Sequence, residues 1–153
     1  MKKIILLIII YFSDSSQLNA LSCMSPNIIK SYQYIDTHSN KTVVILKGNF
    51  FESKLIWEKS KKLETRVINT NFKGFMLGKH GFEIPYSGPV SIVFECFADW
   101  CGSIQSKENI IAFVNIEEQE LKLRIQPCNS TIFSADISDN EHRLLKCHRF
   151  GEC

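Results

Sequence analysis

The sequence predicts a mainly β fold, a five-stranded OB-like barrel with short N-terminal and C-terminal helices, braced by disulfides. Three observations predict it. Five runs of the chain are rich in β-branched and aromatic residues or alternate between apolar and polar side chains. Helical spacing occurs only before the first run and after the last. The chain also holds six cysteines, an even number that is typical of disulfide-braced domains. A β-sandwich of similar strand content is the structural alternative.

The chain opens with a segment that matches a signal peptide. Lys2 and Lys3 precede the apolar run Ile4–Phe12, and small and polar residues follow it. The apolar run is nine residues long, whereas a helix needs roughly 20 residues to cross a bilayer. We therefore expect export and no stable membrane span.

Two cleavage sites have small residues before the cut, one after Ala20 and one after Ser22. The second would make Cys23 the first residue of the mature chain. Alanine stands where a lipoprotein signal normally has leucine, so lipidation is the less favoured reading. Either cut leaves a signal peptide within 1–22 and a single OB-like domain over 23–153. The expected location is the periplasm or, as a secreted protein, the cell exterior.

The first elements after the leader are a helix and a strand. Pro26–Asp36 has apolar residues at helical spacing, and Ser25 before it suits an N-cap. Thr42–Phe51 is rich in β-branched and aromatic residues, which predicts the first strand. Lysine and glutamate dominate Glu52–Thr65, which we interpret as a solvated connection, either without regular structure or in part helical.

Two further strands are expected in the middle of the chain. Arg66–Leu77 alternates loosely, with a bulge or bend at Gly74. Pro85–Pro89 has the composition of a turn, and Val90–Phe97 then predicts the third strand.

The last elements are a hairpin and a helix. Asn109–Ile116 and Glu120–Gln126 are joined by a short polar turn, and the second run alternates cleanly with period two. The C-terminal helix is expected to begin with a capping box, formed by Ser138 and Glu141, and to end near Gly151.

The cysteines predict three disulfides in an oxidising compartment. They are Cys23, Cys96, Cys101, Cys128, Cys147 and Cys153. Spacing does not choose among the 15 connectivities that six cysteines allow. We favour Cys147 with Cys153, which are close in sequence, and Cys23 with the Cys96/Cys101 region. Four residues separate Cys96 from Cys101, unlike the two of a thioredoxin-type pair, so a structural disulfide is favoured over redox catalysis.

Charge and motifs exclude several function classes. The chain has a formal charge of +2, and +1 without Lys2, Lys3 and Asp14, since two positive charges and one negative charge leave. This balance carries no electrostatic footprint for nucleic acid or an anionic membrane. No nucleophile, metalloprotease or phosphate-loop motif is present, so no catalytic residue and no cofactor are predicted.

Histidines and aromatic residues have alternative readings. Cys147 and His148 suggest zinc only weakly, because a second pair of close ligands is missing, and no metal site is predicted. The other histidines lie in polar stretches: His38, His80 and His142. A group of apolar residues interspersed with glycines consists of Phe72, Phe75, Met76, Phe82 and Tyr86. It forms either part of the core or a binding surface, and we favour the core for most of these residues.

Five runs occur together in an order that resembles a known family. They are VVILKGNF (Val43–Phe50), FECFADWCG (Phe94–Gly102), IIAFV (Ile110–Val114), QPC (Gln126–Cys128) and KCHRFGEC (Lys146–Cys153). The chain resembles an uncharacterised family of small exported bacterial proteins that have a cysteine just after the signal peptide. The resemblance implies a bacterial exported protein and no particular chemistry.

The chain more loosely resembles the netrin-like OB-fold modules, which include the tissue inhibitors of metalloproteinases. In these inhibitors the N-terminal cysteine chelates the target's zinc through its α-amino group and carbonyl. The resemblance implies such a functional N-terminus for Cys23, although Ser25 stands where the inhibitors have a second early cysteine.

The function we expect is therefore an exported, non-enzymatic binding or interaction module with an unknown protein partner. A metalloprotease-inhibitor-like protein acting through Cys23 is one alternative, and an envelope enzyme of unknown reaction is the other.

Overall fold

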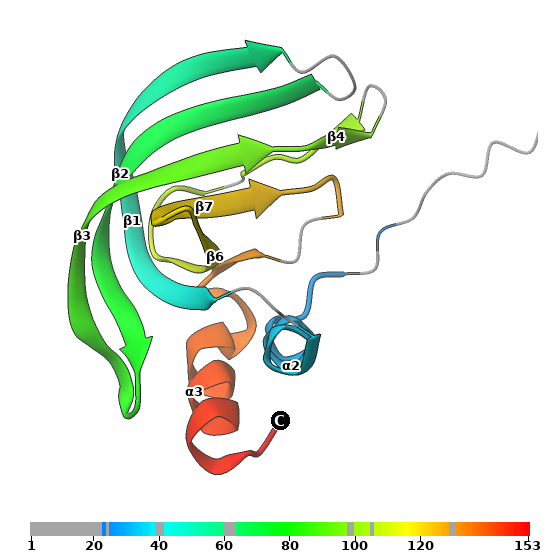
Figure 1. Cartoon of the computed structure of the whole chain (residues 1–153). Helices are drawn as coiled ribbons and strands as arrows, with labels where there is room; N and C mark the ends of the chain where they lie inside the picture. Colours follow the sequence, from blue (N-terminus) through cyan, green and yellow to red (C-terminus); the bar gives the residue numbers. More distant parts are fainter. Residues whose placement is uncertain are drawn as a thin grey trace, which may run out of the picture.

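The computed structural model describes most of the chain (Figure 1). The described residues are 23, 25–38, 42–59, 64–97, 100–104, 106–128 and 131–153. The predicted signal peptide, 1–22, lies outside them. Among the described residues, no helix combines the length and the apolar character that a membrane crossing requires.

The described ranges form two α-helices, a 3₁₀ turn and eight strands. The helical elements are α2 (Ile28–His38), η1 (Ile137–Asp139) and α3 (Asn140–Phe150). The strands are β1 (Val43–Lys59), β2 (Glu64–Gly78), β3 (Gly81–Phe94), β4 (Cys96–Phe97), β5 (Trp100–Cys101), β6 (Ile110–Glu117), β7 (Glu120–Ile125) and β8 (Ile132–Ser134).

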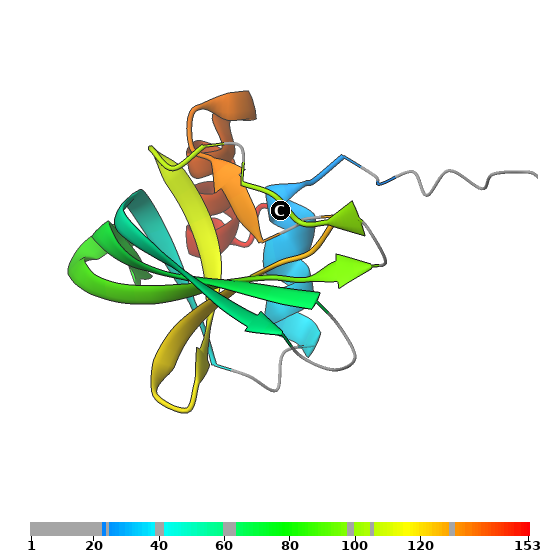
Figure 2. The same ribbon diagram turned by 90° about the horizontal axis from the view of Figure 1, so that it is seen from above.

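Five of these strands form a closed barrel (Figures 1 and 2). Their order is β1-β2-β3-β7-β6, and β6 pairs with β1 to close the ring. Neighbouring strands are antiparallel except β3 and β7, which are parallel. The short β8 pairs with β6, and β4 and β5 form a separate hairpin. The closed ring confirms the predicted five-stranded barrel and excludes the sandwich.

Side chains at alternate positions of the strands fill the interior of the barrel. Leu46 of β1 and Ala112 of β6 are paired and belong to the interior cluster. Their neighbours Ile45 and Phe113 are also paired, but they face the helices outside the barrel, as the period of two in a strand requires. The buried interior residues are Leu46, Phe50, Phe72, Val90, Ile92, Ile110, Ala112, Val114, Leu123 and Ile125.

The helices α2 and α3 lie against each other on one side of the barrel (Figures 1 and 2). A second cluster joins them to β1, β6 and β8, and it consists of Ile28, Ile29, Ile45, Ile111, Phe113, Phe133, Ala135, Leu144 and Cys147. Since β6 contributes to both clusters, every residue from Ile110 to Val114 is buried. This explains why β6 is a continuous apolar run, whereas the half-exposed β7 alternates.

The strands β1 and β2 remain paired past Gly48, the last residue of β1 that pairs with β6. After a bulge, their backbones pair from Lys54 opposite Asn69 to Lys59 opposite Glu64. The expectation of a solvated connection is therefore wrong for 52–59 and 64–65, which lie in β1 and β2, while residues 60–63 lie outside the described part of the chain. Antiparallel pairing satisfies backbone N–H and C=O groups whatever the side chains are, so the charged composition did not reveal the strands.

The predicted turn over Pro85–Pro89 is also wrong, because this segment lies inside β3 and pairs with β2. Over these residues β3 has a neighbour on one side only, since β7 joins it from Ser91 onward. A strand with an open edge tolerates proline, because the missing N–H need not break a ladder hydrogen bond. The turn between β2 and β3 is formed by Lys79 and His80.

The C-terminal hairpin is confirmed. The strands β6 and β7 are joined at Glu118 and Gln119, whose φ angles of 52° and 70° form a tight turn. The predicted strand over Val90–Phe97 is divided, because β3 ends at Phe94 and β4 begins at Cys96.

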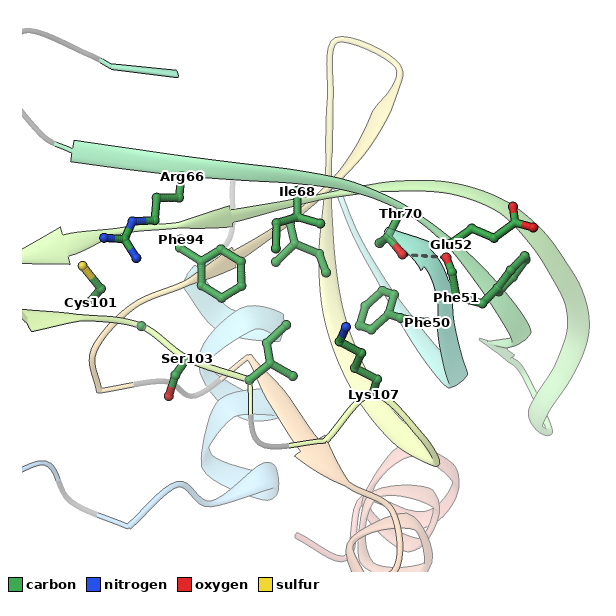
Figure 3. A pocket seen from close by; sticks show the side chains of 13 residues that line it. Phe50, Phe51, Glu52, Arg66, Ile68, Thr70, Phe94, Cys101, Ser103 and Lys107 are labelled. Atoms are coloured by element: carbon green, nitrogen blue, oxygen red, sulfur yellow. Dashed lines mark hydrogen bonds between the residues drawn. The ribbon is translucent and has the colours of Figure 1, made fainter. Parts of the chain in front are cut away.

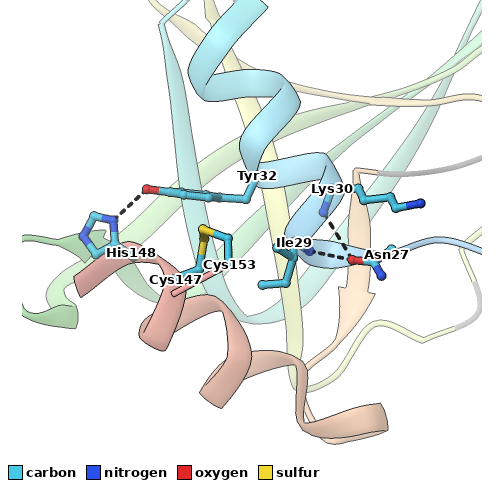
Figure 4. Close-up of a disulfide and its surroundings, with 7 residues drawn as sticks. All are labelled: Asn27, Ile29, Lys30, Tyr32, Cys147, His148 and Cys153. Atoms are coloured by element: carbon cyan, nitrogen blue, oxygen red, sulfur yellow. Dashed lines mark hydrogen bonds between the residues drawn. A yellow bond between two sulfur atoms is a disulfide. The ribbon is translucent and has the colours of Figure 1, made fainter. Parts of the chain in front are cut away.

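The predicted N-terminal helix forms, but its N-cap is Asn27 rather than Ser25. The Asn27 Oδ1 accepts hydrogen bonds from the backbone N–H groups of Ile29 and Lys30, at 3.0 and 3.2 Å (Figure 4). These two donors have no partner inside the helix, so the cap satisfies them.

The predicted N-cap of the C-terminal helix is wrong, because Ser138 lies in η1 and Asp139 is the residue before α3. The helix α3 begins after Asp139, with η1 before it and no capping side chain. Glu141 instead forms an ion pair of 2.5 Å with Lys47 of β1, which links α3 to the barrel wall. The predicted end is confirmed, since Gly151 has a φ of 69° and donates its N–H to the carbonyl of Cys147.

All six cysteines are paired, as Cys23–Cys128, Cys96–Cys101 and Cys147–Cys153. The predicted pairing of Cys147 with Cys153 is confirmed (Figure 4). The expected link from Cys23 to the Cys96/Cys101 region is wrong. The register of β4 and β5 places Cys96 directly opposite Cys101, which leaves Cys128, just after β7, as the partner of Cys23.

Candidate functional site

A pocket of about 490 Å³ opens off the barrel interior (Figure 3). Residues of β1, β2 and β3 line one side of it, and residues 101–104 and Lys107 line the other. The lining residues are Phe50, Phe51, Glu52, Arg66, Ile68, Thr70, Ile92, Phe94, Cys101, Gly102, Ser103, Ile104 and Lys107. Five of them also pack in or against the barrel core: Phe50, Ile68, Ile92, Phe94 and Ile104. The pocket is therefore a continuation of the barrel interior that side chains leave unfilled.

Backbone hydrogen bonds hold Gly102 and Lys107 in place across from the strands. Gly102 is buried and donates its N–H to the carbonyl of Glu95 at 3.1 Å. A Cβ at this position would overlap the backbone carbonyl of Ile125, so glycine permits the close approach to β7. At the other end, the Lys107 carbonyl accepts a hydrogen bond of 2.9 Å from the backbone N–H of Phe50.

In the deep part of the pocket, no side chain of the lining has a hydrogen-bond donor left for a ligand. Thr70 is the one buried polar residue of the lining, and its hydroxyl donates to the carbonyl of Phe51 at 2.8 Å (Figure 3). The charged lining residues are Glu52, Arg66 and Lys107, all of which are exposed. An apolar floor with a charged rim is typical of sites that bind small molecules.

An exposed aromatic pair lies next to the pocket. The disulfide Cys96–Cys101 closes the β4–β5 hairpin, in which Phe97 and Trp100 are paired across the strands. Phe97 is 72% exposed and Trp100 is 38% exposed. Since Cys101 also lines the pocket, the disulfide fixes this aromatic surface to the pocket wall.

Cys23 lies at a different place from the pocket of about 490 Å³. It is exposed, and its disulfide to Cys128 ties it to the turn after β7. Both cysteines border a second hollow of about 590 Å³, whose lining also includes Ile110 and Phe133. Ser103 and Ile104 line both hollows, so the segment that carries them separates the pocket from the Cys23 region.

The aromatic group singled out in the sequence is mostly core, as predicted. Phe72 is fully buried and packs edge-on against Phe50, with ring centroids 5.1 Å apart. Met76 and Tyr86 pack against the barrel interior, and burial raises the pKa of the Tyr86 hydroxyl. Phe75 differs from the others, since it is 46% exposed.

The three histidines whose side chains the structure describes, His80, His142 and His148, do not gather into a reactive site, and the side chain of His38 lies outside the described part. Both ring nitrogens of His148 have partners, because Nε2 donates to the carbonyl of Gly78 at 3.0 Å and Nδ1 is bonded to the Tyr32 hydroxyl at 2.9 Å (Figure 4). His80 lies in the β2–β3 turn, and His142 is exposed on α3. Within the described part of the chain, no three His, Cys, Asp or Glu residues are grouped so that they could hold a metal ion.

A cluster of charged residues on the barrel wall serves to join strands. Arg124 of β7 donates to Glu117 of β6 at 2.8 and 3.1 Å and to Glu95, which follows β3, at 3.0 Å. The hydrogen bonds to Glu117 and then to Glu95 raise the pKa of the Arg124 guanidinium above its usual range, against the lowering effect of burial. The guanidinium group of Arg124 thus links β7 to β6 and to the residue that follows β3.

The comparisons with known proteins identify no relative. No protein-family model, no curated protein and no solved structure matches this chain. The function must therefore be argued from the geometry of the site.

Proposed function

We propose that the chain is an exported, non-enzymatic binding module, which holds an apolar group of its partner in the pocket at the end of the barrel. The observation that carries this proposal is the unfilled apolar space of about 490 Å³. Ligand pockets have volumes of roughly 300–1,000 Å³ and mostly apolar walls. A barrel that served only as a scaffold would fill such a space, because protein interiors are close-packed.

Export is supported by the cysteines and by the leader. Three disulfides are typical of proteins outside the cytoplasm. The leader pattern over 1–22 agrees with a secreted or periplasmic location. The resemblances to small exported bacterial proteins and to netrin-like modules agree with the same placement.

Replacing a residue of the pocket wall tests the proposal. We expect Ile68→Asn to weaken binding of an uncharged fluorescent probe, N-phenyl-1-naphthylamine, by about tenfold, because the buried amide loses water without gaining a partner. The affinity is measured by fluorescence titration, and the melting temperature of each variant verifies folding.

The matched control is Ile116→Asn, the same change at a side chain that is 38% exposed on β6, outside the pocket. It should leave the affinity within about twofold of the wild type. The proposal is wrong if the wild-type protein does not bind the probe, or if both variants bind it as tightly as the wild type.

The inhibitor-like alternative is supported by one observation, the anchoring of an exposed Cys23 by its disulfide to Cys128. That role requires a free α-amino group on Cys23, and hence cleavage after Ser22. N-terminal sequencing of the exported protein decides it, because a mature chain that begins at Leu21 cannot present this group.

A further inference from the structure

We propose that the pocket selects an amphiphile with an apolar chain and a carboxylate end, and that Lys107 provides the counter-charge. This inference rests on the proposed function, since it names the class of ligand that the same pocket takes. It follows from the polarity of the floor, from the placement of the charged rim residues and from the pairing of each of them.

The floor requires that the buried part of the ligand is apolar. Phe50 and Ile92 are buried, and Ile68, Phe94 and Ile104 pack against the barrel core beside them. The hydroxyl hydrogen of Thr70 is already used within the protein. A polar group pushed into this space would lose its water without a replacement, so an alkyl chain or an apolar ring fits best.

The rim favours an anion at the pocket mouth. Lys107 is exposed, and its backbone is fixed by the hydrogen bond from Phe50. Its Nζ points toward the ring of Phe50 at the edge of the pocket (Figure 3). None of the salt bridges among the described residues involves Lys107, so its ammonium group can pair with a carboxylate of the ligand.

The other two charged rim residues are engaged in the protein. Glu52 accepts a hydrogen bond of 3.2 Å from the side chain of Asn71, and its carboxylate points away from the cavity (Figure 3). Arg66 lies at the opposite end of the pocket, beside Phe94 and Cys101 (Figure 3), and has contacts of its own. Lys107 is therefore the residue that we assign to the ligand's charged end.

Three ligands with the same ten-carbon chain test the inference: decanoate, decan-1-ol and decyltrimethylammonium. Each displaces the bound naphthylamine probe in a competition titration below its micelle concentration. We expect decanoate to bind about 3- to 10-fold more tightly than the alcohol, since an exposed ion pair contributes modestly. The cation should bind most weakly of the three.

Two lysine variants complete the test. Lys107→Met should bring decanoate to the affinity of decan-1-ol and leave the alcohol unchanged. Lys73→Met, at an exposed residue of β2 outside the pocket lining, removes the same charge and should preserve the preference for decanoate. Equal affinities of the two ligands for the wild type, or an equal loss of both with Lys107→Met, would overturn the inference but leave the proposed function. Failure of both ligands and of the probe to bind would overturn both.

Discussion

Replacing Gly48 or Gly74 with alanine lowers the free energy of unfolding by about 3–5 kcal/mol. The two glycines are directly opposite each other in β1 and β2. A Cβ on Gly48 would overlap the carbonyl oxygen of Lys73, and a Cβ on Gly74 would overlap that of Lys47. Since both obstacles are backbone atoms of paired strands, the strands would have to separate. Gly48 also has a φ of 155°, which other residues rarely adopt.

The control is Gly88→Ala in β3. A Cβ there meets only the end of the Tyr86 side chain, at 3.0 Å from its hydroxyl oxygen, and that side chain can move. We expect a loss of about 1 kcal/mol or less. Urea unfolding followed by circular dichroism gives all three values. If Gly48→Ala lowers the free energy of unfolding no more than Gly88→Ala does, the close approach of β1 to β2 does not exclude a side chain at position 48.

Removing the disulfide Cys23–Cys128 by replacing both cysteines with alanine lowers the free energy of unfolding by about 4–5 kcal/mol. The bond joins residues that are 105 positions apart. A crosslink restricts the unfolded chain more strongly as the loop that it closes becomes longer, and a loop of about 100 residues corresponds to about 4.7 kcal/mol. Urea unfolding of the oxidised proteins measures the loss.

The same double replacement of Cys147 and Cys153 provides the comparison, because these residues are only six positions apart. The loop-length relation predicts a loss of about 2 kcal/mol for it. An equal or larger loss than for the Cys23–Cys128 variant would show that loop closure does not account for the bracing. Either result also shows how firmly the N-terminal end is held to the barrel.

The fold was largely predictable because most of its elements have a local signature. The strand β7 alternates apolar and polar residues since one face packs inside the barrel. The five-stranded count was correct because β1, β2, β3 and β6 each begin with or contain a dense β-branched or aromatic run. The end of α3 was predictable because helices commonly end at a glycine with a positive φ, and Gly151 is such a residue.

The errors arose where a neighbouring segment decides the structure. Pro85–Pro89 has the composition of a turn, yet the open edge of β3 allows it to pair with β2. The strand from Lys54 to Lys59 is held by backbone pairing with β2, and its apolar and polar residues do not alternate as they do in a half-buried strand. Cys128 became the partner of Cys23 only because the β4–β5 register placed Cys96 opposite Cys101.

The pocket was not predictable for the same reason. Ile68 and Phe94 look like ordinary strand residues, and nothing in their pattern shows that residues 101–104 lie across a space from them. The one local sign was Gly102, which the structure shows in close contact with the end of β7. Cys23, the functional residue that the sequence predicted, lies instead beside the second hollow.

The most direct test of the binding proposal is a nuclear magnetic resonance titration of protein labelled at the isoleucine δ-methyl groups. On addition of N-phenyl-1-naphthylamine, we predict that the signals of Ile68, Ile92 and Ile104 shift together and saturate with one dissociation constant. Those of Ile84 and Ile116, which are exposed outside the pocket, should remain in place. Unchanged pocket signals at saturating probe, or shifts confined to the exposed isoleucines, would contradict the assignment of this pocket as the binding site.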